Sequence, residues 1–147
     1  MNIAFSGCSS LLNIKISSSV KKIEEGAFSN CSSIKEIIIP DSINEMDESI
    51  FLGCSSLEKI SIPFGVTHIS DSMFTDCSQL KDVVIPNSVK VIGECAFSYC
   101  TSISKIVIPE SVVKIDDYAF IGCDSLKDIT IHNIKEYISS NAFEKSL

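Results

Sequence analysis

Cysteine and histidine are the residue types in this 147-residue chain that are best suited to metal binding or redox chemistry. Six of the seven cysteines recur at a constant step of 23 residues, a set of positions that we call a column: Cys8, Cys31, Cys54, Cys77, Cys100 and Cys123. On neighbouring parallel rungs their Cα atoms would lie about 5 Å apart, within disulfide range. The odd total leaves at least one thiol free, however, and no C-x-x-C motif is present. We therefore expect a ladder of buried, reduced thiols, with no metal and no cofactor.

Catalytic chemistry has equally little support. A nucleophile needs a positioned base, and neither His68 nor His132 shares a column with a converging set of Ser, Cys and acid. No Gly-rich phosphate loop follows a strand-like segment. Cys95, the one cysteine outside the column, is predicted to be the exposed thiol that reacts first. We expect no enzymatic activity and no catalytic residue.

Carboxylates form a second column at Glu25, Glu48, Asp71, Glu94 and Asp117. Stacked acids can bind Ca²⁺, but the Gly-rich Asp loops of calcium-binding solenoids are absent here. Each acid precedes an A-F-x-x-C segment or its equivalent. We expect each carboxylate to face the amide N–H groups of its own turn.

These columns belong to a repeat that runs through the whole chain. Phenylalanine forms a column of its own at Phe5, Phe28, Phe51, Phe74, Phe97, Phe120 and Phe143. Six repeats also contain L-x-x-I-x-I or a close variant. The last two branched residues of this pattern lie on one face of a short strand, because strand side chains alternate. In four repeats a proline follows directly and ends the strand, because proline cannot donate to a ladder.

Each repeat then returns through a second apolar pair and a turn. Val20 and Ile23 are the first such pair, and related residues in later repeats predict a second short strand. The A-F-x-x-C segment buries Phe and Cys one turn apart, which predicts a short helical or 3-10 turn. The residue before Cys, for example Gly7 or Asn30, tolerates left-handed backbone, and Tyr99 is the exception.

About eight inward positions in 23 residues cannot close a core alone, but stacked coils bury one another's faces. The sequence therefore predicts a solenoid. Residues 1–147 form a single domain of about six coils, which we expect to be part of a longer array.

One full repeat reads LKDVVIPNSVKVIGECAFSYCTS, and this pattern resembles the leucine-rich repeats of BspA-like proteins. The resemblance covers essentially the whole chain. It implies a right-handed, β-rich leucine-rich repeat solenoid of the α/β horseshoe type, with a parallel sheet on the concave face. It also implies surface-associated or secreted proteins that act in binding and cell adhesion, and it supplies no catalytic residues. Ile50 and Met73 depart from the pattern, in which Ala precedes Phe.

The composition disfavours some classes of binding partner, but it does not determine the cellular location. Twelve lysines against 19 acids give a net charge of −7, which disfavours nucleic acid and anionic membranes. The start of the sequence lacks the features of a secretion signal, and no window approaches about 18 apolar residues. By sequence alone this is typical of a cytoplasmic protein, whereas the resemblance favours the cell surface.

Three outward columns of the predicted strands form the candidate binding face. Charges alternate in sign along one of them, as at Glu36, Lys59 and Asp82, which suits cross-strand pairing. Another contains adjacent apolar residues, Val84 and Val107, flanked by charge as at an interface centre. The three columns hold six lysines and four acids, a net charge of +2, which leaves −9 elsewhere. The predicted protein-binding residues are Lys35, Ile38, Lys59, Ser61, Lys81, Val84, Lys105, Val107, Lys127 and Thr130.

Two functions are compatible with these observations. The first is a protein-binding repeat module for adhesion or recognition, whose concave sheet face binds a protein ligand, as the resemblance implies. The second is a structural or scaffolding element that forms a homo-oligomer through its open ends. The first coil leaves Leu11, Ile14 and Ile16 uncovered on their outer side, and further repeats or a second copy related by a two-fold axis would cover them.

Overall fold

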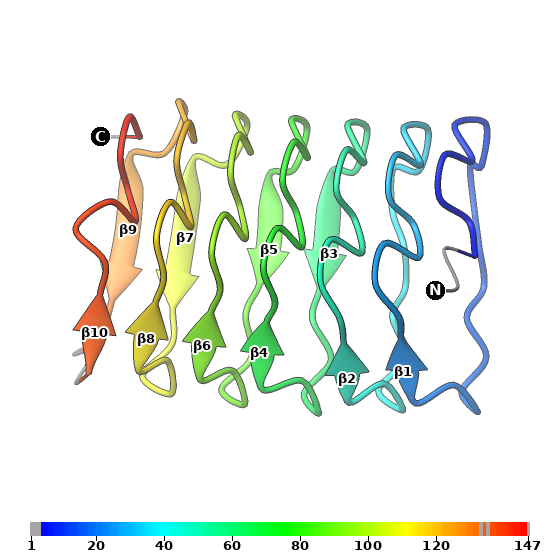
Figure 1. Cartoon of the computed structure of the whole chain (residues 1–147), viewed down its shortest axis with the longest axis horizontal. Coiled ribbons are helices and arrows are strands. Elements are labelled where there is room, and N and C mark those ends of the chain that lie inside the picture. Colours follow the sequence, from blue (N-terminus) through cyan, green and yellow to red (C-terminus); the bar gives the residue numbers. More distant parts are fainter. Residues whose placement is uncertain (1–3, 133, 135, 147) are drawn as a thin grey trace.

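Each 23-residue repeat forms one coil, and successive coils stack along the long axis of the molecule (Figure 1). The computed structural model describes residues 4–132, 134 and 136–146. Every described strand pair is parallel and joins residues that are 23 apart. The sheet structure is therefore made between coils and not within them, as a solenoid requires.

The strands lie in two layers. Figure 1 shows the arrows of the two layers pointing in opposite directions. The strand layer contains β3 (Lys59–Ser61), β5 (Asp82–Val84), β7 (Lys105–Ile108) and β9 (Asp128–Ile131). The return layer contains β1 (Lys22–Ile23), β2 (Glu45–Met46), β4 (His68–Ile69), β6 (Val91–Ile92), β8 (Lys114–Ile115) and β10 (Tyr137–Ile138). The return strands confirm the second short strand predicted for each repeat.

The register of 23 residues keeps each column in line through the stack. In the strand layer Ile60 pairs with Val83 and Ile106 pairs with Ile129, while Ile69 pairs with Ile92 in the return layer. A slip of one residue would turn these apolar side chains to solvent, because strand side chains alternate between faces. Burial of the apolar columns thus specifies the stacking.

The phenylalanine column is the centre of the core. All seven rings stack on their neighbours, with centroids 5.0 to 5.8 Å apart and nearly parallel planes. Four of the rings are fully buried: Phe51, Phe74, Phe97 and Phe120. The constant spacing of phenylalanine in the sequence is thus the spacing of one coil.

The A-F-x-x-C segments are hydrogen-bonded turns, so the prediction of helical or 3-10 turns is wrong. None of the described residues forms a helix, and hence none forms one long and apolar enough to cross a membrane. Two residues have positive φ in each of the five coils whose turns lie between Gly26 and Gly122, such as Gly26 at 61° and Asn30 at 58°. Left-handed residues four positions apart prevent a continuous right-handed helix. The Phe28 amide instead donates to the Ile50 carbonyl of the next coil, at 3.0 Å.

The residues with positive φ form two columns, and the sequence predicted one of them. The residue before Cys has positive φ even at Tyr99, the exception in residue type, where φ is 56°. The other column gives no comparable signal, since only Gly26 belongs to a type that adopts this conformation readily. Its remaining members are Ser49, Ser72, Cys95 and Tyr118.

The stacked rings predict a large loss of stability when one is removed. We expect Phe74→Ala or Phe97→Ala to lower the free energy of unfolding by about 3–5 kcal/mol, because each leaves a cavity in a fully buried column. Guanidinium denaturation measures this change. The control is Phe64→Ala, which removes a ring that is 69% exposed and should change stability by no more than about 0.5 kcal/mol. A loss below about 1 kcal/mol at Phe74 and Phe97 would contradict the stacked core.

Candidate binding face on the strand layer

The outward surface of the strand layer, which we call the strand face, carries the residues that the sequence singled out. Nine of the ten predicted binding residues are exposed, and Thr130 is half-buried. Ile38, Val84 and Val107 form an apolar stripe with exposed fractions of 75%, 60% and 46%. Strand alternation explains the stripe, because the residues on either side of Val107, Ile106 and Ile108, point into the core.

Charged pairs border this stripe. Lys59 Nζ lies 2.9 Å from Glu36 Oε1, and Lys105 Nζ lies 3.0 Å from Asp128 Oδ2. These pairs confirm the predicted alternation of charge at two places. All four side chains are more than half exposed, so each pair stabilises the fold by about 1 kcal/mol at most. Among the described residues, Lys81 forms no ion pair.

A groove of about 1000 Å³ opens between β5 and β7. Among the described residues, no backbone hydrogen bond joins these two strands, whereas β3 pairs with β5 and β7 with β9. The return layer is continuous at this height, from β4 through β6 and β8 to β10. Val83 is half-buried, although the corresponding Ile60 and Ile106 are buried. The strand layer is therefore open at one coil junction.

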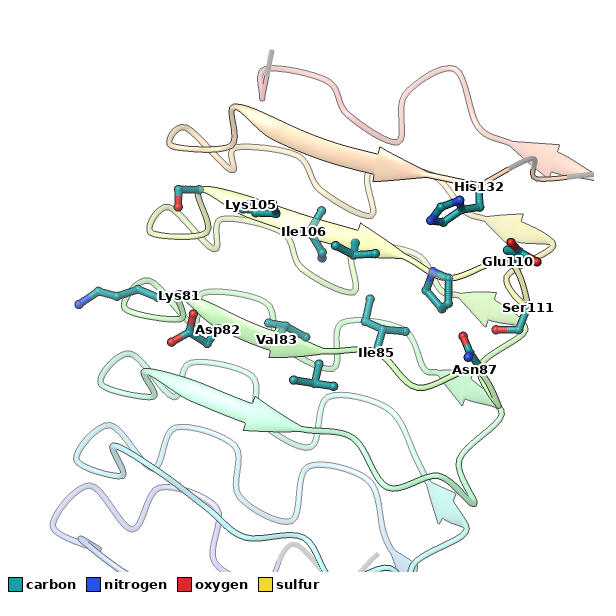
Figure 2. Close-up of a pocket in the computed structure, with 14 residues that line it drawn as sticks. Lys81, Asp82, Val83, Ile85, Asn87, Lys105, Ile106, Glu110, Ser111 and His132 are labelled. Carbon is teal, nitrogen blue, oxygen red and sulfur yellow. The ribbon is translucent and has the colours of Figure 1, made fainter.

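The groove has an apolar floor and polar ends. Figure 2 shows Val83 on β5, Ile85 directly after it and Ile106 on β7, with Lys81 and Asp82 at one end. The other end is lined by Asn87, Glu110, Ser111 and His132. Within the described part of the chain, the Ser111 hydroxyl is the one buried side-chain polar atom without a hydrogen-bond partner.

Sequence reasoning found the strand part of this groove and missed its far end. Lys81, Val84, Lys105 and Val107 were predicted and all line the groove. The residues at the far end come after the strands, in segments that were treated only as strand stops. Asn87 and Glu110 share a column, so an inspection of the loop columns could have found them. The sequence contains no comparable signal for the opening between β5 and β7.

A second, smaller hollow lies on the same face. It has a volume of about 360 Å³ and is lined by Ile38, Ser61 and Val84 together with parts of the flanking strands. Ser61 is small, and it stands in the outward column between two large apolar side chains. The hollow is the space that a larger residue at Ser61 would fill.

The cysteine column is a ladder of buried thiols, and each thiol links two coils. Cys54 Sγ donates a hydrogen bond to the Phe28 carbonyl of the preceding coil at 3.1 Å. The same bond, also at 3.1 Å, joins Cys31 to Phe5, Cys77 to Phe51, Cys100 to Phe74 and Cys123 to Phe97. Burial raises the pKa of the Cys54 and Cys123 thiols to about 12. None of the described cysteines forms a disulfide.

The prediction that Cys95 is the exposed thiol is wrong. Cys8 is exposed, because no described coil covers it on its outer side. Cys95 is only half-buried, but burial raises the pKa of its thiol, and the neighbouring Glu94 carboxylate raises it further. The column had suggested that Cys8 would share the environment of the other ladder thiols.

The acidic column also behaves differently from the prediction. Asp71 Oδ1 accepts a hydrogen bond from the Glu94 amide of the next coil at 2.8 Å, rather than from its own turn. Asp117 Oδ1 accepts one from the Ser139 hydroxyl, again in the next coil. Among the described residues, no group of three or more His, Cys, Asp or Glu side chains is placed to bind a metal. These carboxylates act as links between coils.

The stacked coils and the parallel strand layer define a leucine-rich repeat solenoid. The chain belongs to the family described as the BspA type leucine rich repeat region, whose model matches residues 1–104 and 67–147 in six copies. A comparison with curated proteins finds no match.

Three solved bacterial structures share the fold. A leucine rich cell surface protein from Faecalibacterium prausnitzii is 40% identical over 86% of this chain and 34% of its own, with a TM-score of 0.79. A leucine-rich repeat protein from T. pallidum is 37% identical over 86% of this chain and 59% of its own, with a TM-score of 0.83. One from Bacteroides ovatus is 33% identical over 97% of this chain and 43% of its own, with a TM-score of 0.75. The chain thus spans less than two thirds of each relative.

Thiol exposure predicts an order of reactivity. We expect one thiol, Cys8, to react fast with a chromogenic disulfide reagent at pH 8, and Cys95 to follow slowly, because its pKa is raised. The five buried thiols should react only after denaturation. Cys8→Ser should remove the fast phase, and Cys95→Ser should leave it unchanged. A fast phase that survives Cys8→Ser would contradict the assignment.

The raised pKa values predict loss of stability in alkali. Above pH 9 the unfolded chain releases thiol protons, whereas the folded chain retains those of Cys54 and Cys123 up to about pH 12. Stability is therefore complete below pH 9 and declines between these values, by up to about 1.4 kcal/mol per pH unit for each buried thiol. Denaturant melts between pH 7 and 11 measure the slope.

Lysine side chains also lose their protons in this pH range, so a serine variant is used to separate the effect of the thiols on stability from the effect of the lysines. Ser146 already occupies the cysteine column and donates to the Phe120 carbonyl as the thiols do. Cys77→Ser/Cys100→Ser removes two buried thiols and should reduce the alkaline slope. An unchanged slope would show that thiol ionisation does not cause the loss.

Proposed function

We propose that this chain is a non-catalytic module that binds a protein partner through its strand face, in adhesion or recognition. The observation that carries the proposal is the groove between β5 and β7, which opens on the same face as the apolar stripe. An apolar centre inside a charged rim is the usual composition of a protein-binding surface.

The charge distribution supports a protein rather than a nucleic acid as the partner. The strand face carries a net charge of +2, and the other residues carry −9. A duplex would meet repulsion from most of the molecule, whereas a protein segment contacts the strand face alone.

Location at the cell surface is part of the proposal. The relative from F. prausnitzii is described as a cell surface protein, and its sequence is 40% identical to this chain over the shared region. A repeat module with an open binding face suits adhesion there, since stacked repeats create extended binding surfaces.

Self-association is the second candidate, and one feature favours it. A hollow of about 460 Å³ over the first described coil is lined by Phe5, Ile14, Ile16 and Val20, among others. A second copy of the chain could cover these apolar side chains. Further repeats of the same pattern would cover them equally well.

Paired charge substitutions test the strand face. The protein is used to capture partners from surface extracts of the organism that produces it, or of the cells that this organism contacts. We expect Val84→Glu/Val107→Glu to reduce the amount of a specifically captured protein at least tenfold. Both side chains are exposed, so the thermal melt should be preserved. The matched control is Asn44→Glu/Thr67→Glu, which adds the same charge at exposed positions of two adjacent return-side segments.

The outcomes separate the two candidates. Equal capture by the wild type, the variant and the control would contradict the strand face as the binding surface. If the captured protein is the chain itself and Phe5→Glu blocks its capture, self-association is the function.

A further inference from the structure

We propose, on the basis of the strand-face function, that the partner presents an extended segment that runs along the stack, across the strands. This segment inserts two large apolar side chains, at alternate positions of its sequence, into the two hollows of the strand face. An acidic side chain next to them pairs with Lys81. The ligand class is thus an extended, acidic and apolar peptide segment.

The two hollows form a pair separated by one ridge. The small hollow is centred on Ser61, and the groove lies between β5 and β7. Val84 lines both of them and stands between them. Each hollow has apolar side chains at its centre and polar ones at its edges, so each can accept a large apolar side chain of the ligand.

The separation of the hollows matches an extended chain. Adjacent paired strands lie about 4.8 Å apart, and β5 and β7 are not paired, so the distance from Ser61 to the middle of the groove, about one and a half coils, is at least about 7 Å. Side chains at positions i and i+2 of an extended segment lie on one face, about 6.8 Å apart. Two alternate side chains therefore reach both hollows while the residue between them passes over Val84.

The polar groups of the groove favour an extended ligand over a helix. Polar side chains line both ends of the groove, among them Asp82 at one end and Asn87 and Glu110 at the other. An extended segment that crosses the strands has free N–H and C=O groups for such side chains, whereas a helix uses its own internally. The Asn87 side chain is exposed and offers both a donor and an acceptor at the far end.

Charge completes the description of the ligand. Lys105 is engaged by Asp128, but Lys81, at the same end of the groove, forms no ion pair among the described residues. Asp82 lies beside it, yet the strand columns as a whole retain two lysines in excess. An acidic side chain on the ligand neutralises this excess, and a basic one would enlarge it.

A displayed library of random linear heptapeptides, selected on the whole folded chain, tests the proposal. We expect the enriched peptides to contain two large apolar residues separated by one residue, with Asp or Glu adjacent. A synthetic copy of one such peptide, fluorescently labelled, then gives dissociation constants by anisotropy.

Three variants define the binding mode. Ser61→Ile fills the small hollow with a residue suited to a strand, and we expect it to weaken peptide binding at least tenfold. Thr67→Ile introduces the same side chain at an exposed position on the return side, away from both hollows, and it should leave binding within twofold of the wild type. Lys81→Glu should weaken binding at least fivefold, and the loss should shrink in 0.5 M salt.

The results distinguish failure of this inference from failure of the proposed function. If Ser61→Ile and Lys81→Glu bind the peptide as the wild type does while Val84→Glu/Val107→Glu does not, the two-hollow mode is wrong and the strand face stands. Enriched peptides with apolar residues three or four apart would indicate a helical ligand and overturn the proposal. If none of the strand-face variants affects either the peptide or the captured protein, both proposals fail.

Discussion

The structure depends on the contact of each coil with the next at a register of 23 residues. No coil has a core of its own, so phenylalanine rings, strand pairs and thiol bonds all form between coils. The direction of these links is constant: the Phe51 amide donates forward to Met73, and the Cys77 thiol donates back to the Phe51 carbonyl. Each phenylalanine position is thus held from both sides, which makes the turn side of the stack its most uniform part.

The strand pairing is less uniform in both layers, and the proposed function depends on one of its interruptions. The strand layer is interrupted between β5 and β7, where the return layer is continuous from β4 to β10, and the return layer is itself unpaired between β2 and β4. The fold tolerates this interruption because the same two coils remain joined through the return layer and through the stacked rings of Phe74 and Phe97. An opening of this kind provides a groove without loss of the core.

Much of the architecture could be predicted from the repeat, and the candidate site only in part. The buried columns, the free thiols and the outward position of Val84 and Val107 follow from periodicity, because burial in a stack is set by the side of the strand on which a residue lies. The helical turn was predicted wrongly, since Ser49 and Tyr118 adopt a left-handed backbone that their residue types rarely take. The exposed thiol was also predicted wrongly. Cys8 and Cys54 are equivalent in the repeat, but Cys8 lies in an outer coil and is exposed, whereas Cys54 lies inside the stack and is buried.

The sequence by itself determined the family, the length of a coil and the residues that face the core, because these depend on a pattern that repeats at one spacing. Only the tertiary structure decided that β5 and β7 are not paired. It also decided that Asp71 and the buried thiols form hydrogen bonds to a neighbouring coil and not within their own turns. The physical reason is that the repeat specifies the same contacts at every junction. The separation at one junction depends on the packing of whole coils against each other, and Val83 and Ile106 look alike in the pattern whether or not their strands pair.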